Sequence, residues 1–399
     1  LAHFCLLFLR GKRRPPSGRG SPGYQIETGS GGPEGRKRTT QQRGKTMYIV
    51  IAILLFGVLI AAHEWGHFIA ARLCGVTVHE FAIGMGPMVW HKDGKKGTKF
   101  TLRALPIGGF CAMEGEETES EDPHSLSNQG FWKKILVFAA GAAMNFLVGV
   151  LIILVLNFQA AGFYVPVVAG CAPEFEAVNG AALLEGDEFY SINGSRVYLT
   201  GDIDLLLMLA NRQSIDLVVL RDGERVEFNN LSVGTYSDSE GNPYQGYGFY
   251  RSAVVKEATL GARLQYTWYN AVDFVRTVWF SLQMLVTGSA GVSDLSGPVG
   301  IVSTINEVGA QSASVADALV NIAYFGAMIA VNLAVMNLLP IPALDGGHIM
   351  FLIVSTIGEK VFHKKVPMKY EAVINMVFLA LLMGLMLFVT FNDVMKLIH

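Results

Sequence analysis

Charged side chains are scarce in this chain of 399 residues, at 16% against roughly 25% in ordinary soluble domains. Hydrophobic residues make up 51% of the sequence, and its mean hydropathy is +0.38. This composition argues against a soluble globule, a disordered hub and a nucleic-acid-binding protein. Cysteine is also rare and never paired as CxxC, which argues against a disulfide framework and a cysteine-ligated metal site. The four cysteines are Cys5, Cys74, Cys111 and Cys171.

The few charges are unevenly distributed. Residues 1–46 carry a net charge of +8, and the rest of the chain carries −10. This first segment is rich in Gly, Pro, Ser, Arg and Lys, and it has too little apolar periodicity to offset its conformational entropy, so we predict a disordered basic tail. Because a long apolar run follows directly after Met47, we expect Met47 to be the natural start and the tail to be non-native. A native tail that touches anionic lipid is the alternative.

Four apolar runs are long enough to cross a bilayer as helices, which takes about 20 residues. We expect membrane-spanning helices over residues 47–72, 135–158, 318–347 and 373–391. Eight Lys and Arg residues lie between positions 72 and 134, and four lie between positions 360 and 369, so both loops are predicted to be cytoplasmic. The sequence therefore predicts a polytopic α-helical membrane protein, with a cytoplasmic-side loop over 73–134 and a segment of about 160 residues outside.

The segment over residues 165–252 is polar and turn-rich. Asp222-Gly223 separates two β-branched runs, which predicts a hairpin. ALLEGDEF at 182–189, followed by SING at 191–194, resembles the core signature of a PDZ domain, so we expect an inserted, extracytoplasmic PDZ-like (α+β) domain. PDZ domains accept an extended peptide at a sheet edge. The usual glycine-rich carboxylate-binding loop is not evident here, so peptide binding and a spacer without a ligand both remain open.

Residues 255–290 mix apolar, polar and aromatic side chains, including two tryptophans. This pattern is typical of an amphipathic helix that lies at the membrane interface.

The first span contains HEWGH at residues 63–67, an HExxH pattern. Residues four apart share one helix face, so His63 and His67 can bind one metal ion, and Glu64 can reach a water molecule there. A glutamate and two histidines inside a bilayer span are costly and mark a functional site. A buried polar cluster that only ties helices together is the structural alternative.

Two histidines leave a catalytic zinc site short of a third protein ligand. The third span ends in NLLPIPALDGGH at residues 337–348, where two prolines and two glycines cannot continue a helix. Unwound backbone at membrane depth is tolerated where it is buried in protein or lines a wet cavity. Asp345 in this break is well placed to supply a carboxylate oxygen, and His348 is a rival ligand that spacing does not exclude.

These motifs resemble those of the site-2 protease family of intramembrane zinc metalloproteases, specifically the branch of bacterial regulator-of-sigma-E proteases. The matching segments are HEWGH, NLLPIPALDGG at 337–347, LPIGGF at 105–110 and SGPVGI at 296–301. With the four spans and the single PDZ-like domain, the resemblance covers nearly everything from Met47 onward.

The resemblance implies a role for each candidate residue. His63, His67 and Asp345 would hold Zn2+, and Glu64 would be the general base. Asn337 would contact the substrate backbone or the developing oxyanion. Residues 84–110, within the 73–134 loop, would form a re-entrant β-hairpin that pairs with an unwound substrate.

The resemblance also implies an intramembrane endopeptidase of the bacterial inner membrane, with its active site near the cytoplasmic side. Its substrates would be single-span membrane proteins, such as anti-sigma factors or signal-peptide remnants, pre-trimmed by another protease and filtered by the PDZ-like domain. Two other classes are weighed against it. A membrane scaffold would bind tails through the PDZ-like domain and keep zinc for structure, and a zinc or proton transporter would need a polar path that the third and fourth spans scarcely offer.

Overall fold

The computed structural model describes residues 8–9, 34–94, 97–116, 118–180, 182–237, 243–291, 294–363 and 368–398. The chain divides into two compact units. One comprises Leu1–Ile152 with Thr277–His399, and the other comprises Ile153–Arg276. Helices α2 (Phe131–Gln159) and α5 (Leu260–Val286) each contribute to both units.

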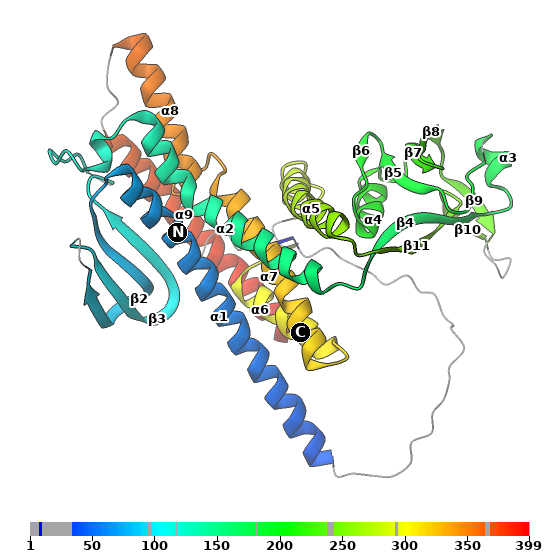
Figure 1. Ribbon diagram of the computed structural model, residues 1–399, viewed down its shortest axis with the longest axis horizontal. Coiled ribbons are helices and arrows are strands. Elements are labelled where there is room, and N and C mark those ends of the chain that lie inside the picture. Colours follow the sequence, from blue (N-terminus) through cyan, green and yellow to red (C-terminus); the bar gives the residue numbers. More distant parts are fainter. Residues whose placement is uncertain are drawn as a thin grey trace. The chain divides into compact units, whose positions relative to one another are not determined.

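The first unit is a bundle of long apolar helices (Figure 1). Besides α2, its helices are α1 (Glu34–Cys74), α6 (Pro298–Gln311), α7 (Val315–Asn337), α8 (Asp345–Phe362) and α9 (Met368–Ile398). Among the described residues, four helical segments are long and apolar enough to cross a membrane: Met47–Cys74, Phe131–Gln159, Val315–Asn337 and Lys369–Lys396. These are the four runs expected from the sequence, so the chain is a multi-pass membrane protein with added β structure.

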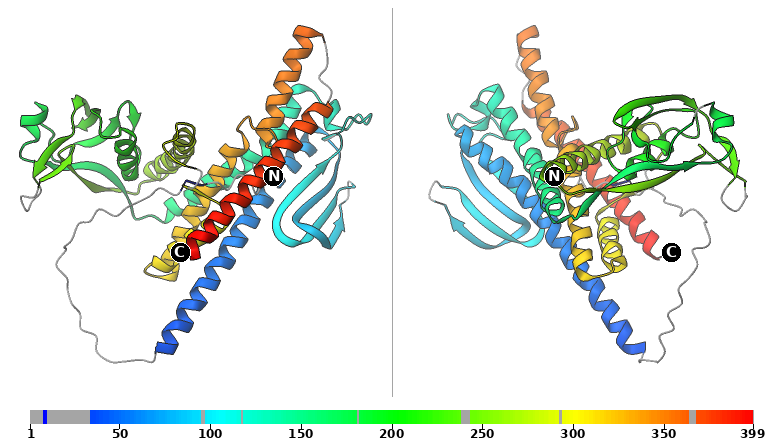
Figure 2. Two further views of the ribbon diagram at one scale, coloured as in Figure 1. Left: turned by 180° about the vertical axis from the view of Figure 1, so that it is seen from behind. Right: turned by 45° about the vertical axis from the view of Figure 1, so that its right-hand side comes forward.

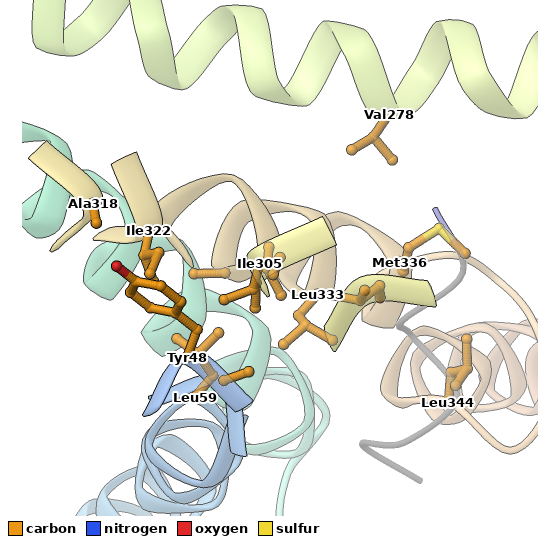
Figure 3. Packing of buried hydrophobic residues seen from close by; sticks show 13 residues of the cluster. Tyr48, Leu59, Val278, Ile305, Ala318, Ile322, Leu333, Met336 and Leu344 are labelled. Carbon is orange, nitrogen blue, oxygen red and sulfur yellow. The ribbon is translucent and has the colours of Figure 1, made fainter. Parts of the chain in front are cut away.

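The core of this bundle forms where α1, α6 and α7 meet (Figure 3). Tyr48 of α1 packs among Ile305 of α6 and Ile322 of α7. The approach is close because Gly309 lies under the ring: a Cβ atom at this residue would lie 2.7 Å from Tyr48. Of the four spans, α7 is the most buried and α9 the least, so α7 is central and α9 presents its apolar surface outward.

Helix boundaries differ from the expectations in three places. The predicted disordered tail is helical from Glu34, and most of residues 1–33 lie outside the described part of the chain. The expected break does follow the third span, whose helix ends at Asn337, but it is shorter than expected because a new helix, α8, begins at Asp345. Helix α6 was not expected: Pro298 stands in its first turn, where a missing N–H costs nothing.

Strands β2 (Val78–Asp93) and β3 (Lys99–Met113) form the predicted hairpin, longer than residues 84–110. The hairpin folds back on itself, because Ile83 pairs with both Gly109 and Leu102. Left-handed glycines at the bends, such as Gly84 and Gly108, permit this curvature. Figure 2 shows the curled strands beside α1, and the C-terminal part of β3 packs against that helix.

The second unit is an α+β domain built on antiparallel strands. Its main sheet has the order β11-β4-β5-β7-β8, with β6 paired to β5. These strands are β4 (Gly162–Cys171), β5 (Glu188–Ile192), β6 (Ser195–Arg196), β7 (Ile215–Arg221), β8 (Glu224–Leu231) and β11 (Phe249–Glu257). The remaining elements are α3 (Phe175–Asn179), α4 (Thr200–Leu209) and the hairpin of β9 (Gly234–Ser237) with β10 (Pro243–Gly246). The expected turn at Asp222-Gly223 joins β7 to β8, with both residues at positive φ.

Asp187, within the segment that resembles a PDZ signature, is a fixed point of this domain. Its carboxylate accepts hydrogen bonds from Arg221 Nε (2.9 Å) and Nη2 (2.7 Å), and from the Leu184 backbone N–H. These donors hold the pKa of the buried Asp187 below its usual range despite the cost of desolvation. The pair joins the β5 segment to the end of β7.

Candidate metal centre

Helix α1 places His63 and His67 one turn apart on one face, and both side chains are buried. Asp345, at the first turn of α8, points at the same spot. Its Oδ2 lies 3.3 Å from His63 Nε2 and 3.4 Å from His67 Nε2, and the two Nε2 atoms are 3.3 Å apart. Residues from two distant parts of the sequence thus converge on one point.

This donor set fits a zinc ion. Ligand atoms about 2.0–2.1 Å from a tetrahedral zinc lie about 3.3–3.4 Å from one another, which is the spacing of these three atoms. Asp345 Oδ2 is buried and has no hydrogen-bond partner within the described residues. A bound cation would satisfy this oxygen, whereas an isolated buried carboxylate is strongly disfavoured.

The break before α8 positions Asp345. Ala343 adopts φ 71°, and its backbone N–H donates to Asn375 Oδ1 of α9 at 3.0 Å. Gly346 passes so close to the preceding loop that a Cβ atom there would lie 2.2 Å from Leu339 O. Glycine at this position is therefore a steric requirement, and it lets α8 restart at Asp345.

His348, the rival ligand, faces a different partner. Its Nδ1 lies 2.9 Å from Glu371 Oε1 of α9, and its ring stacks on Phe138 of α2 at a centroid distance of 5.1 Å. Among the described residues, the group that could hold a metal ion comprises His63, His67 and Asp345 without His348.

His348 borders a cavity of about 700 Å³ at this end of the bundle. Its polar lining includes Glu116, Lys134, Glu359 and Glu371. Burial raises the pKa of Glu116 to about 7. The cavity therefore reaches His348, three residues after Asp345 on α8.

Glu64 lies beside the hairpin. A Cβ atom at Gly109 of β3 would come within 3.2 Å of Glu64 Cγ. The expected general base therefore sits between the two histidines in sequence and next to a β-strand in space.

Asn337, the expected substrate-contact residue, ends α7 with its Nδ2 atom 3.4 Å from His63 Nδ1. Sequence reasoning did not select Asn145 of α2, whose Nδ2 is also 3.4 Å from His63 Nδ1. An asparagine in the middle of an apolar span was the signal that could have identified it.

A membrane-embedded HExxH facing a carboxylate from a broken helix defines a membrane metallopeptidase. The chain belongs to the site-2 protease family: the sequence model of Peptidase family M50 matches residues 51–385.

Relatives agree with this assignment. The chain is 36% identical to a protein of Clostridium perfringens and 37% identical to one of Clostridium acetobutylicum, both described as zinc metalloproteases. Each alignment covers 87% of this chain, and 98% and 97% of the respective relatives. It is also 27% identical to the regulator of sigma-W protease RasP of Bacillus subtilis, over 88% of this chain and 98% of RasP. The protein is therefore a zinc metalloprotease.

Proposed function

We propose that this protease is an intramembrane endopeptidase that cuts transmembrane segments of single-span membrane proteins, with His63, His67 and Asp345 as its zinc ligands. The observation that carries the proposal is the spacing of the three donor atoms, 3.3–3.4 Å, beside an otherwise unpartnered Asp345 Oδ2. Two of the three ligands lie within the span Met47–Cys74.

Zinc, when bound, supplies Lewis acidity that polarises a carbonyl and makes water a nucleophile near neutral pH. Glu64 accepts the proton of the attacking water and returns it to the leaving amine. Asn337 donates a hydrogen bond to the oxyanion that develops on the scissile carbonyl. Its position next to His63 supports this role.

A peptide bond in a helix is shielded by its neighbours, so the substrate must unwind before attack. We infer that the β2–β3 hairpin stabilises the unwound segment by strand addition, which satisfies backbone groups that lipid cannot. The proximity of β3 to Glu64 supports this inference, because a strand added there would run past the general base.

The B. subtilis relative is named for regulation of sigma-W. By that similarity, we propose anti-sigma factors as one substrate class and signal-peptide remnants as another, in the bacterial inner membrane. The basic loops support an orientation with the active site near the cytoplasmic side and the PDZ-like domain, residues 165–252, outside. There the domain acts as a size filter that admits substrates already trimmed by another protease.

Cleavage of a truncated single-span substrate in detergent tests the proposal. The wild type is compared with Glu64→Gln, with and without a zinc chelator, and with Glu121→Gln as an exposed control. We expect the wild type and the control, but not Glu64→Gln, to cut within the transmembrane segment of the substrate. The chelator should abolish this cleavage. Equal behaviour of wild type and Glu64→Gln, with a substrate that a relative cuts, would favour a scaffold with structural zinc instead.

A further inference from the structure

Helix α2 presents a polar group to each histidine of the HExxH motif. The Val137 carbonyl lies 2.8 Å from His67 Nδ1. Two turns further along α2, the Asn145 amide lies 3.4 Å from His63 Nδ1. One face of α2 therefore contacts both imidazoles.

The direction of the His63 ring decides where its proton lies. Its Nε2 faces His67 and Asp345, so in a metal-bound state Nε2 must be free of a proton. The neutral ring then carries its proton on Nδ1, which becomes a donor and needs an acceptor. A metal-binding histidine generally donates its other N–H to such an acceptor.

Asn145 can supply this acceptor. Its side chain is only 1% exposed, and its Oδ1 has no hydrogen-bond partner within the described residues. The oxygen and nitrogen of an amide are assigned from their surroundings. Turning the amide by half a rotation places Oδ1 next to His63 Nδ1, so the unpaired oxygen gains a donor. Asn337 Nδ2 is at the same distance from Nδ1, but Asn337 also makes an interaction besides this one.

We propose that Asn145 is a positioning residue: its amide oxygen accepts the Nδ1 proton of His63, which fixes the tautomer that presents Nε2 to zinc. The inference rests on the proposed role of His63 as a ligand. It gives the buried asparagine of α2 a task distinct from that of Asn337, which acts on the substrate.

Metal affinity of the full chain in detergent tests this role directly. Zinc binding is measured by competition with a chromogenic chelator, and the ligand field is read from the absorption of bound Co²⁺. Loss of the acceptor in Asn145→Leu is expected to weaken zinc binding about 10- to 100-fold, as for other partners of metal-binding histidines. The Asn145→Asp variant keeps an acceptor for the His63 proton, so its zinc affinity should stay within about tenfold of that of the wild type.

Asn157→Leu is the matched control, because it makes the same change on the same helix and its amide donates to Thr267 instead of facing His63. It should leave zinc affinity unchanged. If Asn145→Leu does not fold, Asn145→Ala removes the same acceptor, and thermal unfolding without metal shows whether each variant is folded. Saturating zinc should restore most of the activity of the acceptor-free variant, whereas a merely structural defect would persist.

Wild-type affinity in a folded acceptor-free variant would overturn the positioning role and leave the proposed function intact. Failure of the proposed function has a different result: His63→Ala would then bind zinc as tightly as wild type.

Discussion

Gly141 of α2 lies directly against the imidazole of His67 on α1. A Cβ atom at residue 141 would lie 2.3 Å from His67 Nε2 and 2.7 Å from His63 Cε1, closer than real Cβ contacts. The helices also approach at Gly66, where a Cβ atom would lie 2.3 Å from the Ala140 carbonyl oxygen. The metal centre therefore requires a residue without a side chain at position 141 of α2.

Gly141→Ala should consequently displace both rings and reduce zinc occupancy to a small fraction of wild type. Metal content of the purified protein, measured by atomic emission, checks this. Gly384→Ala in α9 is the control, since a Cβ atom there meets nothing within 4 Å. Full zinc occupancy in Gly141→Ala would show that the helices can separate without cost to the site.

Asp393 of α9 caps α6. Its Oδ2 accepts hydrogen bonds from the backbone N–H groups of Gly297 and Gly300, both at 2.8 Å, at a buried position. Asp393→Leu leaves both donors unpaired, which costs about 1–3 kcal/mol each. We expect a clear fall in unfolding temperature in detergent and a smaller fall for Asp393→Asn, which keeps one acceptor oxygen. Met395→Leu, an exposed change on the same helix, should have no effect.

The second unit should lose stability as pH rises. Burial, together with the hydrogen bond and charge of Asp202, raises the pKa of Asp273 to about 8. An unfolded aspartate has a pKa of about 3.9, so between these values the folded state holds a proton that the unfolded state has lost. Stability therefore falls as pH rises from about 4 to about 8 and levels off above that range.

Asp273→Asn should remove this slope, because the amide keeps a hydrogen bond to Asp202 without the charge. Thermal unfolding at pH 6 and pH 9 should show a stabilisation relative to wild type that is larger at pH 9. Asp204→Asn is the control, because Asp204 is exposed and paired with Arg251 at the surface, where such pairs contribute little. An equal effect of Asp273→Asn at both pH values would contradict the assignment.

Removal of residues 165–252, replaced by a short flexible linker, should let the enzyme cut substrates that have not been trimmed. The proposed filter acts by steric exclusion, so its removal should admit larger substrates. The deleted residues include none of the zinc ligands, so cleavage itself should persist. Cleavage of full-length and truncated forms of one substrate, by the intact and shortened enzymes, measures this. Continued discrimination by the shortened enzyme would place the filter within the membrane unit.

The sequence alone determined the features that depend on neighbours along the chain. The length of an apolar run predicts a span, the i,i+4 spacing places His63 and His67 on one face, and Asp222-Gly223 specifies a turn. Each follows from local geometry and solvation, which do not require knowledge of distant residues.

Tertiary structure decided the rest. Asp345 and His348 are equivalent candidate ligands by spacing. Only packing distinguishes them, because His348 interacts with Glu371 and stacks on Phe138. Two glycines after a Pro-containing break predict a loop from the sequence. In the structure, however, Gly346 allows α8 to begin at Asp345. Gly141 and Asn145 belong to the site only because α2 packs behind α1. Such contacts join residues far apart in sequence, and no local pattern encodes them.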